Sequence, residues 1–184
     1  MSKTGLILFA RAESGEQLDI AVEMSIENIL TLDDKFELHF VGFGPPLMKI
    51  PKSTNKDTYE SLDIRLFQNV VCEKLDLFSK LGYNKSLIVS CGYEIQNKQF
   101  LDKNLTIVSY DDSDFVEKKN LNHRFMYGRT ALLKRIWENK SFDITKDLDK
   151  NLFLNVFNVV GFSNMNAHRV NMNNFMNRTD WIFQ

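Results

Sequence analysis

The 184-residue sequence has little cysteine, little proline and no long hydrophobic run. Its two cysteines, Cys72 and Cys91, lie in apolar contexts, which is typical of small buried residues in a reducing compartment. A disulfide framework or a zinc site needs more ligands at tighter spacing. The apolar run Leu6–Ala10 is too short for a signal sequence, and no later segment approaches the ~20 residues of a membrane span. We therefore expect a cytoplasmic protein without a membrane span.

An excess of positive charge is also missing. The chain has 23 Lys and Arg against 24 Asp and Glu, so its formal net charge is −1. Nucleic-acid-binding proteins usually carry a strong basic excess, and there is no strong nucleic-acid signal here. A composition of 43% hydrophobic and 26% charged residues excludes global disorder. The length suits one domain over residues 1–184.

The best-marked catalytic and nucleotide-binding motifs are absent. The sequence has no P-loop, C-x-x-C, H-E-x-x-H or G-x-S-x-G, and no G-x-G-x-x-G follows the first expected strand. The turn after that strand reads R-A-E-S-G-E and holds one glycine. The three histidines lie far apart in sequence, and each alone is more often structural than catalytic.

Hydrophobic periodicity predicts strands that alternate with helices. The expected strands are Gly5–Ala10, Phe36–Phe43, Ser86–Ser90 and Leu105–Tyr110; the expected helices are Gln17–Leu32, Thr58–Leu81 and Asn122–Asn139. We expect Leu47–Lys56 to be a loop and Gly82 to cap the second helix. The alternation predicts an α/β fold: a single layered domain with a mostly parallel central sheet flanked by helices, of the Rossmann-like kind.

The C-terminal segment, residues 151–184, differs in composition from the rest. Nine of the 27 residues from Asn151 to Asn177 are asparagine. Nucleotide bias in the gene is a sufficient explanation for that count. Asparagine beside aromatic residues is also typical of a wet interface, a self-association surface or a substrate pocket, so a homo-oligomer could form through this segment. The apolar run Leu152–Phe162 predicts a buried strand or hairpin.

An acidic segment, S-Y-D-D-S-D-F, follows the fourth expected strand. Asp112 and Asp114 would project to the same side of an extended chain. Two carboxylates at that spacing can bind Mg²⁺ or Mn²⁺ and leave room for waters and phosphate oxygens. Alternatively, Asp114 and Glu117 have the form of a helix N-cap with its N3 partner. The sequence leaves both interpretations open.

The second half of the chain carries a basic and aromatic stretch, His123–Trp137, then a polar loop with acidic residues, then the apolar run. This order resembles the acceptor-side half of the GT-A-type, inverting glycosyltransferases. The start of the chain, with a strand, a polar turn, a helix and a strand, is similar to the start of that family. In this sequence the D-x-D falls one element later than in the family, and the acidic pair Asp147 and Asp149 is split by Leu148.

The resemblance implies roles for several residues. Asp147 lies where the family has its catalytic base, with Asp149 near it, and Arg11 and Glu13 line the turn that meets the nucleotide base. The implied partners are a nucleotide-sugar donor and an unknown acceptor.

Basic residues and a metal complete that interpretation. His123, Arg124 and Arg129 could add positive charge to the diphosphate, although a solvated helix face also explains them. Mg²⁺ or Mn²⁺ on Asp112 and Asp114 would neutralise the leaving diphosphate.

Two functions of other classes remain open. One is a non-catalytic binding or assembly protein that uses the asparagine- and aromatic-rich segment as its contact surface. The other is a metal-dependent phosphoryl-transfer or nuclease domain in which Glu13 would join Asp112 and Asp114.

Overall fold

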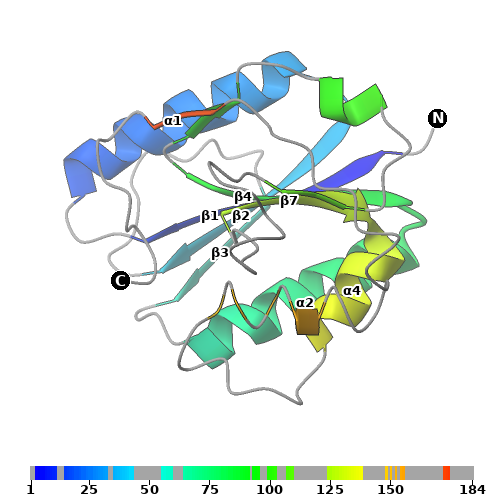
Figure 1. Ribbon diagram of the computed structural model, residues 1–184. Helices are drawn as coiled ribbons and strands as arrows, with labels where there is room; N and C mark the ends of the chain where they lie inside the picture. Colours follow the sequence, from blue (N-terminus) through cyan, green and yellow to red (C-terminus); the bar gives the residue numbers. More distant parts are fainter. Residues whose placement is uncertain are drawn as a thin grey trace.

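The computed structural model describes residues 3–11, 15–32, 35–43, 55–59, 64–91, 93–95, 99–102, 107–109, 124–138, 148, 150, 152, 154, 155 and 172–174. Six strands form the main sheet in the order β3-β2-β1-β4-β7-β6 (Figure 1). They are β1 (Thr4–Arg11), β2 (Phe36–Phe43), β3 (Asn55–Tyr59), β4 (Lys85–Ser90), β6 (Ile107–Ser109) and β7 (Phe125–Arg129). Strands β3, β2, β1 and β4 are parallel, and β7 is antiparallel to both of its neighbours. The prediction of an α/β fold with a mostly parallel sheet is confirmed.

Among the described residues, three helices cover the two faces of this sheet. Helix α1 (Gly15–Leu32) lies on one face, and α2 (Ile64–Lys80) and α4 (Thr130–Glu138) lie on the other (Figure 1). A second, two-stranded sheet pairs β5 (Tyr93–Ile95) with β8 (Met172–Asn174), and a 3₁₀ turn, η1 (Gln99–Asp102), follows β5. None of the helices among the described residues is long and apolar enough to cross a membrane.

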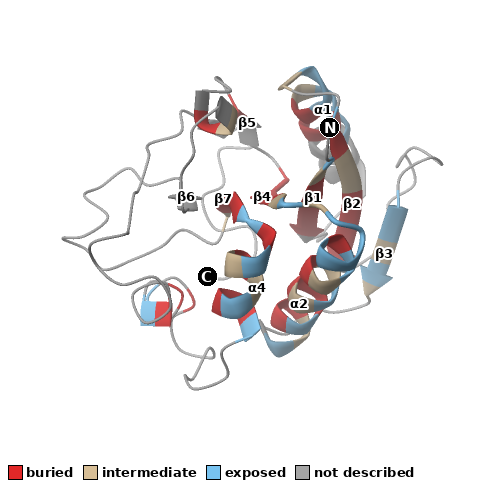
Figure 2. Cartoon of the chain, turned by 90° about the vertical axis from the view of Figure 1, so that its right-hand side faces the viewer, coloured by how far each residue is buried: buried red, intermediate tan, exposed pale blue. Residues whose placement is uncertain are grey.

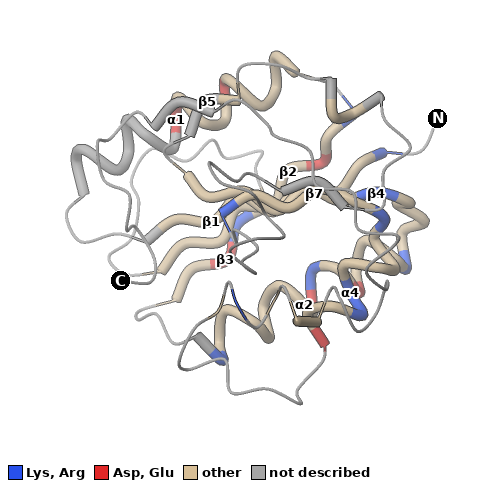
Figure 3. The backbone as a smooth tube through the Cα atoms, viewed as in Figure 1, with Lys and Arg blue, Asp and Glu red and all other residues tan. Residues whose placement is uncertain are grey.

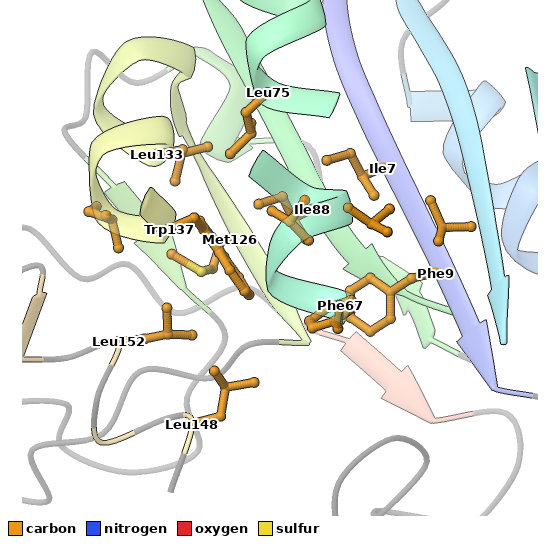
Figure 4. Close-up of a cluster of buried hydrophobic side chains, with 14 of the residues drawn as sticks. Ile7, Phe9, Phe67, Leu75, Ile88, Met126, Leu133, Trp137, Leu148 and Leu152 are labelled. Carbon is orange, nitrogen blue, oxygen red and sulfur yellow. The ribbon is translucent and has the colours of Figure 1, made fainter. Parts of the chain in front are cut away.

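Strands β1 and β4 are apolar in their middle, at Leu6–Ala10 and Leu87–Val89, because both of their faces are buried there. In β1, Ile7 and Phe9 pack with α2 and α4, whereas Leu6 and Leu8 pack on the α1 side, as alternation along a strand requires. Burial is concentrated along the sheet and the inner sides of the helices (Figure 2). Figure 4 shows that Trp137 lies in the cluster between the sheet and α4.

Side-chain amides bind the end of helix α4. Gln68 Nε2 donates to the carbonyl of Trp137 (2.6 Å), and Asn155 Nδ2 donates to the carbonyl of Ile136 (2.8 Å). The last carbonyls of a helix have no partner within it, so these two amides satisfy acceptors that burial would otherwise leave unpaired. Leu152 packs into the same core, which fixes the chain beyond α4 against the sheet.

Ion pairs join α2 to α4 along their outer side. Asp76 lies 2.6 Å from Lys80 Nζ and 2.7 Å from Lys134 Nζ. The hydrogen bond from Lys134 and then that from Lys80 lower the pKa of Asp76 to about 2. Acidic and basic segments adjoin along these two helices in Figure 3.

Most of the predicted elements are confirmed. Gly82 has φ 77°, and the amide N–H of Tyr83 donates to the carbonyl of Phe78 (2.9 Å), so Gly82 ends α2 as expected. Cys91 is buried and Cys72 is partly buried, and the two do not form a disulfide.

Three predictions of secondary structure were wrong in part. The helix over Asn122–Asn139 is strand β7 followed at once by helix α4. The helix over Thr58–Leu81 begins at Ile64, and strand β3 occupies Asn55–Tyr59, partly where we expected a loop. The strand over Leu152–Phe162 has helical backbone at residues 152, 154 and 155; the rest of that range lies outside the described residues.

Candidate functional site

The order in which strands are added to the sheet reverses between β1 and β4. Strands β2 and β3 lie in turn on one side of β1, and β4 lies on its other side. Helix α1 follows β1 on one face and α2 precedes β4 on the opposite face, so the two connections diverge at this point (Figure 1). Such a switch point opens a crevice outside the carboxyl ends of the strands, where ligands of open α/β sheets bind.

Backbone hydrogen bonds hold the strands together at the carboxyl ends of β1 and β4. The amide N–H of Cys91 donates to the carbonyl of Phe9 (2.7 Å), and that of Ser90 donates to the carbonyl of Arg124 (2.8 Å). The carboxyl ends of β1 and β4 and the start of β7 therefore form a rigid rim. On the α1 side of the rim, the Ser25 hydroxyl donates to the sulfur of Cys91 (3.7 Å), which anchors α1 there.

The structure brings two of the predicted site residues to this rim. Arg11 is the last residue of β1, and Arg124 directly precedes β7. Arg129 is the last residue of β7 and pairs with Lys85, the first residue of β4. It therefore lies at the opposite end of these strands from Arg124. At ~3.3 Å per residue the Cα atoms of Arg124 and Arg129, five positions apart, are separated by about 17 Å. Arg124 and Arg129 therefore cannot contact one diphosphate together, and neither belongs to the solvated helix face that we considered.

The remaining predicted site residues lie outside the described residues: Glu13, Asp112, Asp114, His123, Asp147 and Asp149. Within the part of the chain that the structure describes, no three His, Cys, Asp or Glu side chains form a group that could hold a metal ion. Strand β6 ends at Ser109, three positions before Asp112, and it runs parallel to β4, so it ends at the same edge as β4.

A second polar cluster, which the sequence analysis missed, joins β2 and β3 to helix α2. Lys74 Nζ lies 2.5 Å from Asp57 Oδ2 and 3.3 Å from His39 Nδ1. On the other side of the imidazole, His39 Nε2 lies 3.5 Å from Glu37 Oε1, and the hydroxyl of Tyr83 donates to Glu37 Oε2 (2.5 Å). We call this chain of contacts the His39 relay. His39 is 4% exposed, so the imidazole at the centre of the relay is buried, whereas the side chains of Asp57 and Glu37 at its two ends are partly exposed.

The protonation of the relay follows from its donors. A lysine ammonium can only donate, so Nδ1 of His39 accepts from Lys74 and the ring hydrogen is on Nε2, facing Glu37. Burial, and next the charge of Lys74, lower the pKa of His39. The hydrogen bond from Tyr83 is the largest cause that lowers the pKa of Glu37, and the same bond raises the pKa of Tyr83.

We expect this arrangement to make the protein less stable below neutral pH. The unfolded chain takes up a proton on His39 near pH 6.5, whereas the folded protein resists it, so stability is full above that pH and falls as the pH drops towards the folded pKa. Urea unfolding at pH 7.5 and pH 5.5 measures the change. His39→Gln should show a smaller loss between the two pH values than the wild type; an equal loss would contradict the role of His39.

The comparisons with known proteins give no family. No protein-family model matches the chain, and no curated protein matches it significantly.

Proposed function

We propose that the chain is a divergent glycosyltransferase-like protein that uses a nucleotide sugar as donor and acts in the cytoplasm. The observation that carries this proposal is the switch point between β1 and β4, because nucleotides and other ligands of open α/β sheets bind at such a point, outside the carboxyl ends of the strands. The succession of β1, α1 and β2 agrees with the start expected of the family, and we propose that the fold is of the Rossmann-like or GT-A-like kind.

The charges at this edge suit a diphosphate. Arg11 and Arg124 both come from the rim, and an arginine can bind phosphate oxygens with two parallel hydrogen bonds. The acidic segment with Asp112 and Asp114 begins where β6 reaches the same edge. We leave Arg129 out of the proposed donor site, because it lies at the other end of β7.

The proposed reaction is a direct displacement at the anomeric carbon of the sugar. As the acceptor hydroxyl attacks, Asp147 takes its proton, a bond forms between the acceptor oxygen and the anomeric carbon, and the bond to the diphosphate breaks. Asp149 lies two positions further along the chain and would support that base. A divalent cation on Asp112 and Asp114 would supply charge neutralisation for the diphosphate.

Thermal unfolding with and without Mn²⁺ tests the donor site. Because a ligand that binds only the folded state stabilises it, uridine or guanosine diphosphate with Mn²⁺ should raise the melting temperature. Asp112→Asn and Asp114→Asn should each remove the metal-dependent part of the rise. No response of the wild type to any nucleotide would contradict the proposal.

Glu117→Gln is the matched control, because it removes one negative charge from the same segment. If Asp114 and Glu117 only cap a helix, Asp114→Asn and Glu117→Gln will both leave nucleotide binding unchanged and will change stability little, because Asn and Gln serve as well at the N-cap and N3 positions. If Asp114 binds the metal, only Asp114→Asn will weaken the response. The assembly alternative predicts instead that Asp112→Asn and Asp147→Asn leave function intact, while Trp181→Ala abolishes it.

A further inference from the structure

The two-stranded sheet of β5 and β8, which we call the ribbon, lies beside the switch point. Strand β5 begins two residues after Cys91, whose amide N–H binds the carbonyl of Phe9 at the rim. Because consecutive Cα atoms are ~3.8 Å apart, those of Cys91 and Tyr93 are separated by at most about 8 Å. Asn174, at the end of β8, pairs with Tyr93. The asparagine-rich C-terminal segment is therefore brought close to the carboxyl ends of β1 and β4.

The ribbon is attached to helix α1 by one asparagine. Asn28 Oδ1 accepts from the amide N–H of Ile95 (2.8 Å), and Asn28 Nδ2 donates to the carbonyl of the same residue (3.2 Å). Ile95 is 2% exposed and packs in the cluster between α1 and the sheet. Figure 3 shows β5 beside α1. The ribbon therefore bounds the switch point on its α1 side.

The hydrogen bonds of Asn28 take the place of a third strand of the ribbon. In an antiparallel pair, the backbone groups of successive residues point alternately towards the partner strand and away from it. Those of Ile95 face Asn28, so those of Glu94 face β8 and pair with Asn173, the residue opposite. Without Asn28 the buried N–H and C=O of Ile95 would lose these partners, which costs free energy. The position of the ribbon thus depends on this amide.

We infer that Asn28 is a positioning residue of the proposed nucleotide site and that it acts through the ribbon. This inference rests on the proposed function. Both polar atoms of the Asn28 side chain bind Ile95, so Asn28 holds the ribbon in place as one wall of the site. The bound nucleotide and the paired ribbon then stabilise each other, because a coupling between two binding events is reciprocal.

Nucleotide binding and amide hydrogen exchange together test the inference. Binding of uridine or guanosine diphosphate with Mg²⁺ is measured by titration calorimetry, and exchange is followed at the amide of Asn173. Asn28→Ala removes both bonds to Ile95. Asn173→Pro removes a backbone donor of β8 and so breaks the ribbon without changing α1.

Asn155→Ala is the matched control. It also removes a buried asparagine amide that binds a backbone carbonyl, but this carbonyl belongs to Ile136 in α4, on the opposite face of the sheet. A loss of stability alone would therefore affect Asn155→Ala and Asn28→Ala alike. A loss of the ribbon wall would affect only Asn28→Ala.

We expect Asn28→Ala to weaken nucleotide binding about tenfold or more and to speed the exchange of the Asn173 amide by a similar factor. Asn155→Ala should lower the melting temperature and leave both quantities unchanged. In the wild type, bound nucleotide should slow the exchange of Asn173. The double variant Asn28→Ala/Asn173→Pro should bind no more weakly than Asn173→Pro alone, because the two changes disrupt one structure.

The outcomes separate this inference from the proposed function. If the wild type binds the nucleotide and Asn28→Ala binds it equally well, the inference is overturned and the proposed function stands. Additive losses in the double variant would also overturn it, since Asn28 would then act by another route. If Asn28→Ala does not fold, unchanged binding by Asn173→Pro overturns the inference. No binding by the wild type contradicts the proposed function, and the inference falls with it.

Discussion

Gly5→Ala is expected to lower the free energy of unfolding by about 3 kcal/mol, at the upper end of the usual cost of overpacking a core. A Cβ atom at Gly5 would lie 2.6 Å from Cε2 of Phe78 and closer still to two other atoms of its ring. Phe78 is fully buried against the ring of His39, so the whole ring would have to move. Such a loss is a large fraction of the 5–15 kcal/mol that stabilises a typical domain. Chemical denaturation of the two proteins measures it.

Gly42→Ala is the control for this substitution. Its Cβ would meet Cε1 of Phe40 at 2.9 Å, an atom at the far end of a side chain, so a smaller shift relieves the contact. We therefore expect a cost well below that of Gly5→Ala. In the background of Phe78→Leu the cost of Gly5→Ala should fall, because the two changes share one space. Equal costs at the two glycines, or no rescue, would contradict the account of this contact.

Trp137→Ala is expected to cost about 4 kcal/mol, as other large-to-small changes of buried aromatic residues do. Trp137 is 1% exposed, and its ring packs edge-on against Phe67 at 5.6 Å between centroids. Figure 4 shows Met126 beside it. The loss therefore combines lost burial with a cavity between α4 and the sheet. Urea unfolding of the variant measures it.

Trp137→Phe separates the ring from its polar group. The indole Nε1 is buried and has no hydrogen-bond partner among the residues that the structure describes, so phenylalanine removes an unsatisfied donor while it keeps an aromatic ring in the core. We expect the loss of stability to be much smaller than that caused by alanine.

Leu30→Ala is the control for both substitutions. Leu30 is 51% exposed on α1, so this change should alter stability by less than ~0.5 kcal/mol. A cost for Trp137→Phe close to that for Trp137→Ala would show that the indole is held by more than packing.

The buried strands could be predicted from the sequence because their hydrophobic runs are short and bounded. Phe36–Phe43 was predicted with its bounds correct. Strand β3, N-K-D-T-Y, was missed because it lies at the edge of the sheet, where polar residues are tolerated and give no apolar pattern. Strand β7 was missed because it passes into α4 without a break, so its apolar residues continued the helical spacing.

The sites depend on contacts that sequence distance conceals. The return of β4 to the far side of β1 creates the switch point, and no local pattern reports which strands are neighbours. The His39 relay takes its residues from β2, β3, α2 and the turn after α2. Only one of these contacts could have been predicted from the sequence. Glu37 and His39 are two positions apart on one strand, so their side chains project from the same face. We expected Arg124 and Arg129 to lie on one helix. They lie instead at opposite ends of strand β7.

The most direct test of the proposed donor site is to record amide NMR spectra of the ¹⁵N-labelled protein during titration with uridine or guanosine diphosphate. Mg²⁺ is used as the cation because Mn²⁺ broadens the signals. Binding at the switch point should shift the amides of the rim, namely Ala10, Arg11, Cys91 and Phe125. Gly82 and Lys85, at the opposite edge, should not move. Shifts confined to Gly82, Lys85 and Arg129, or no shifts with either nucleotide, would contradict a nucleotide site at the carboxyl edge.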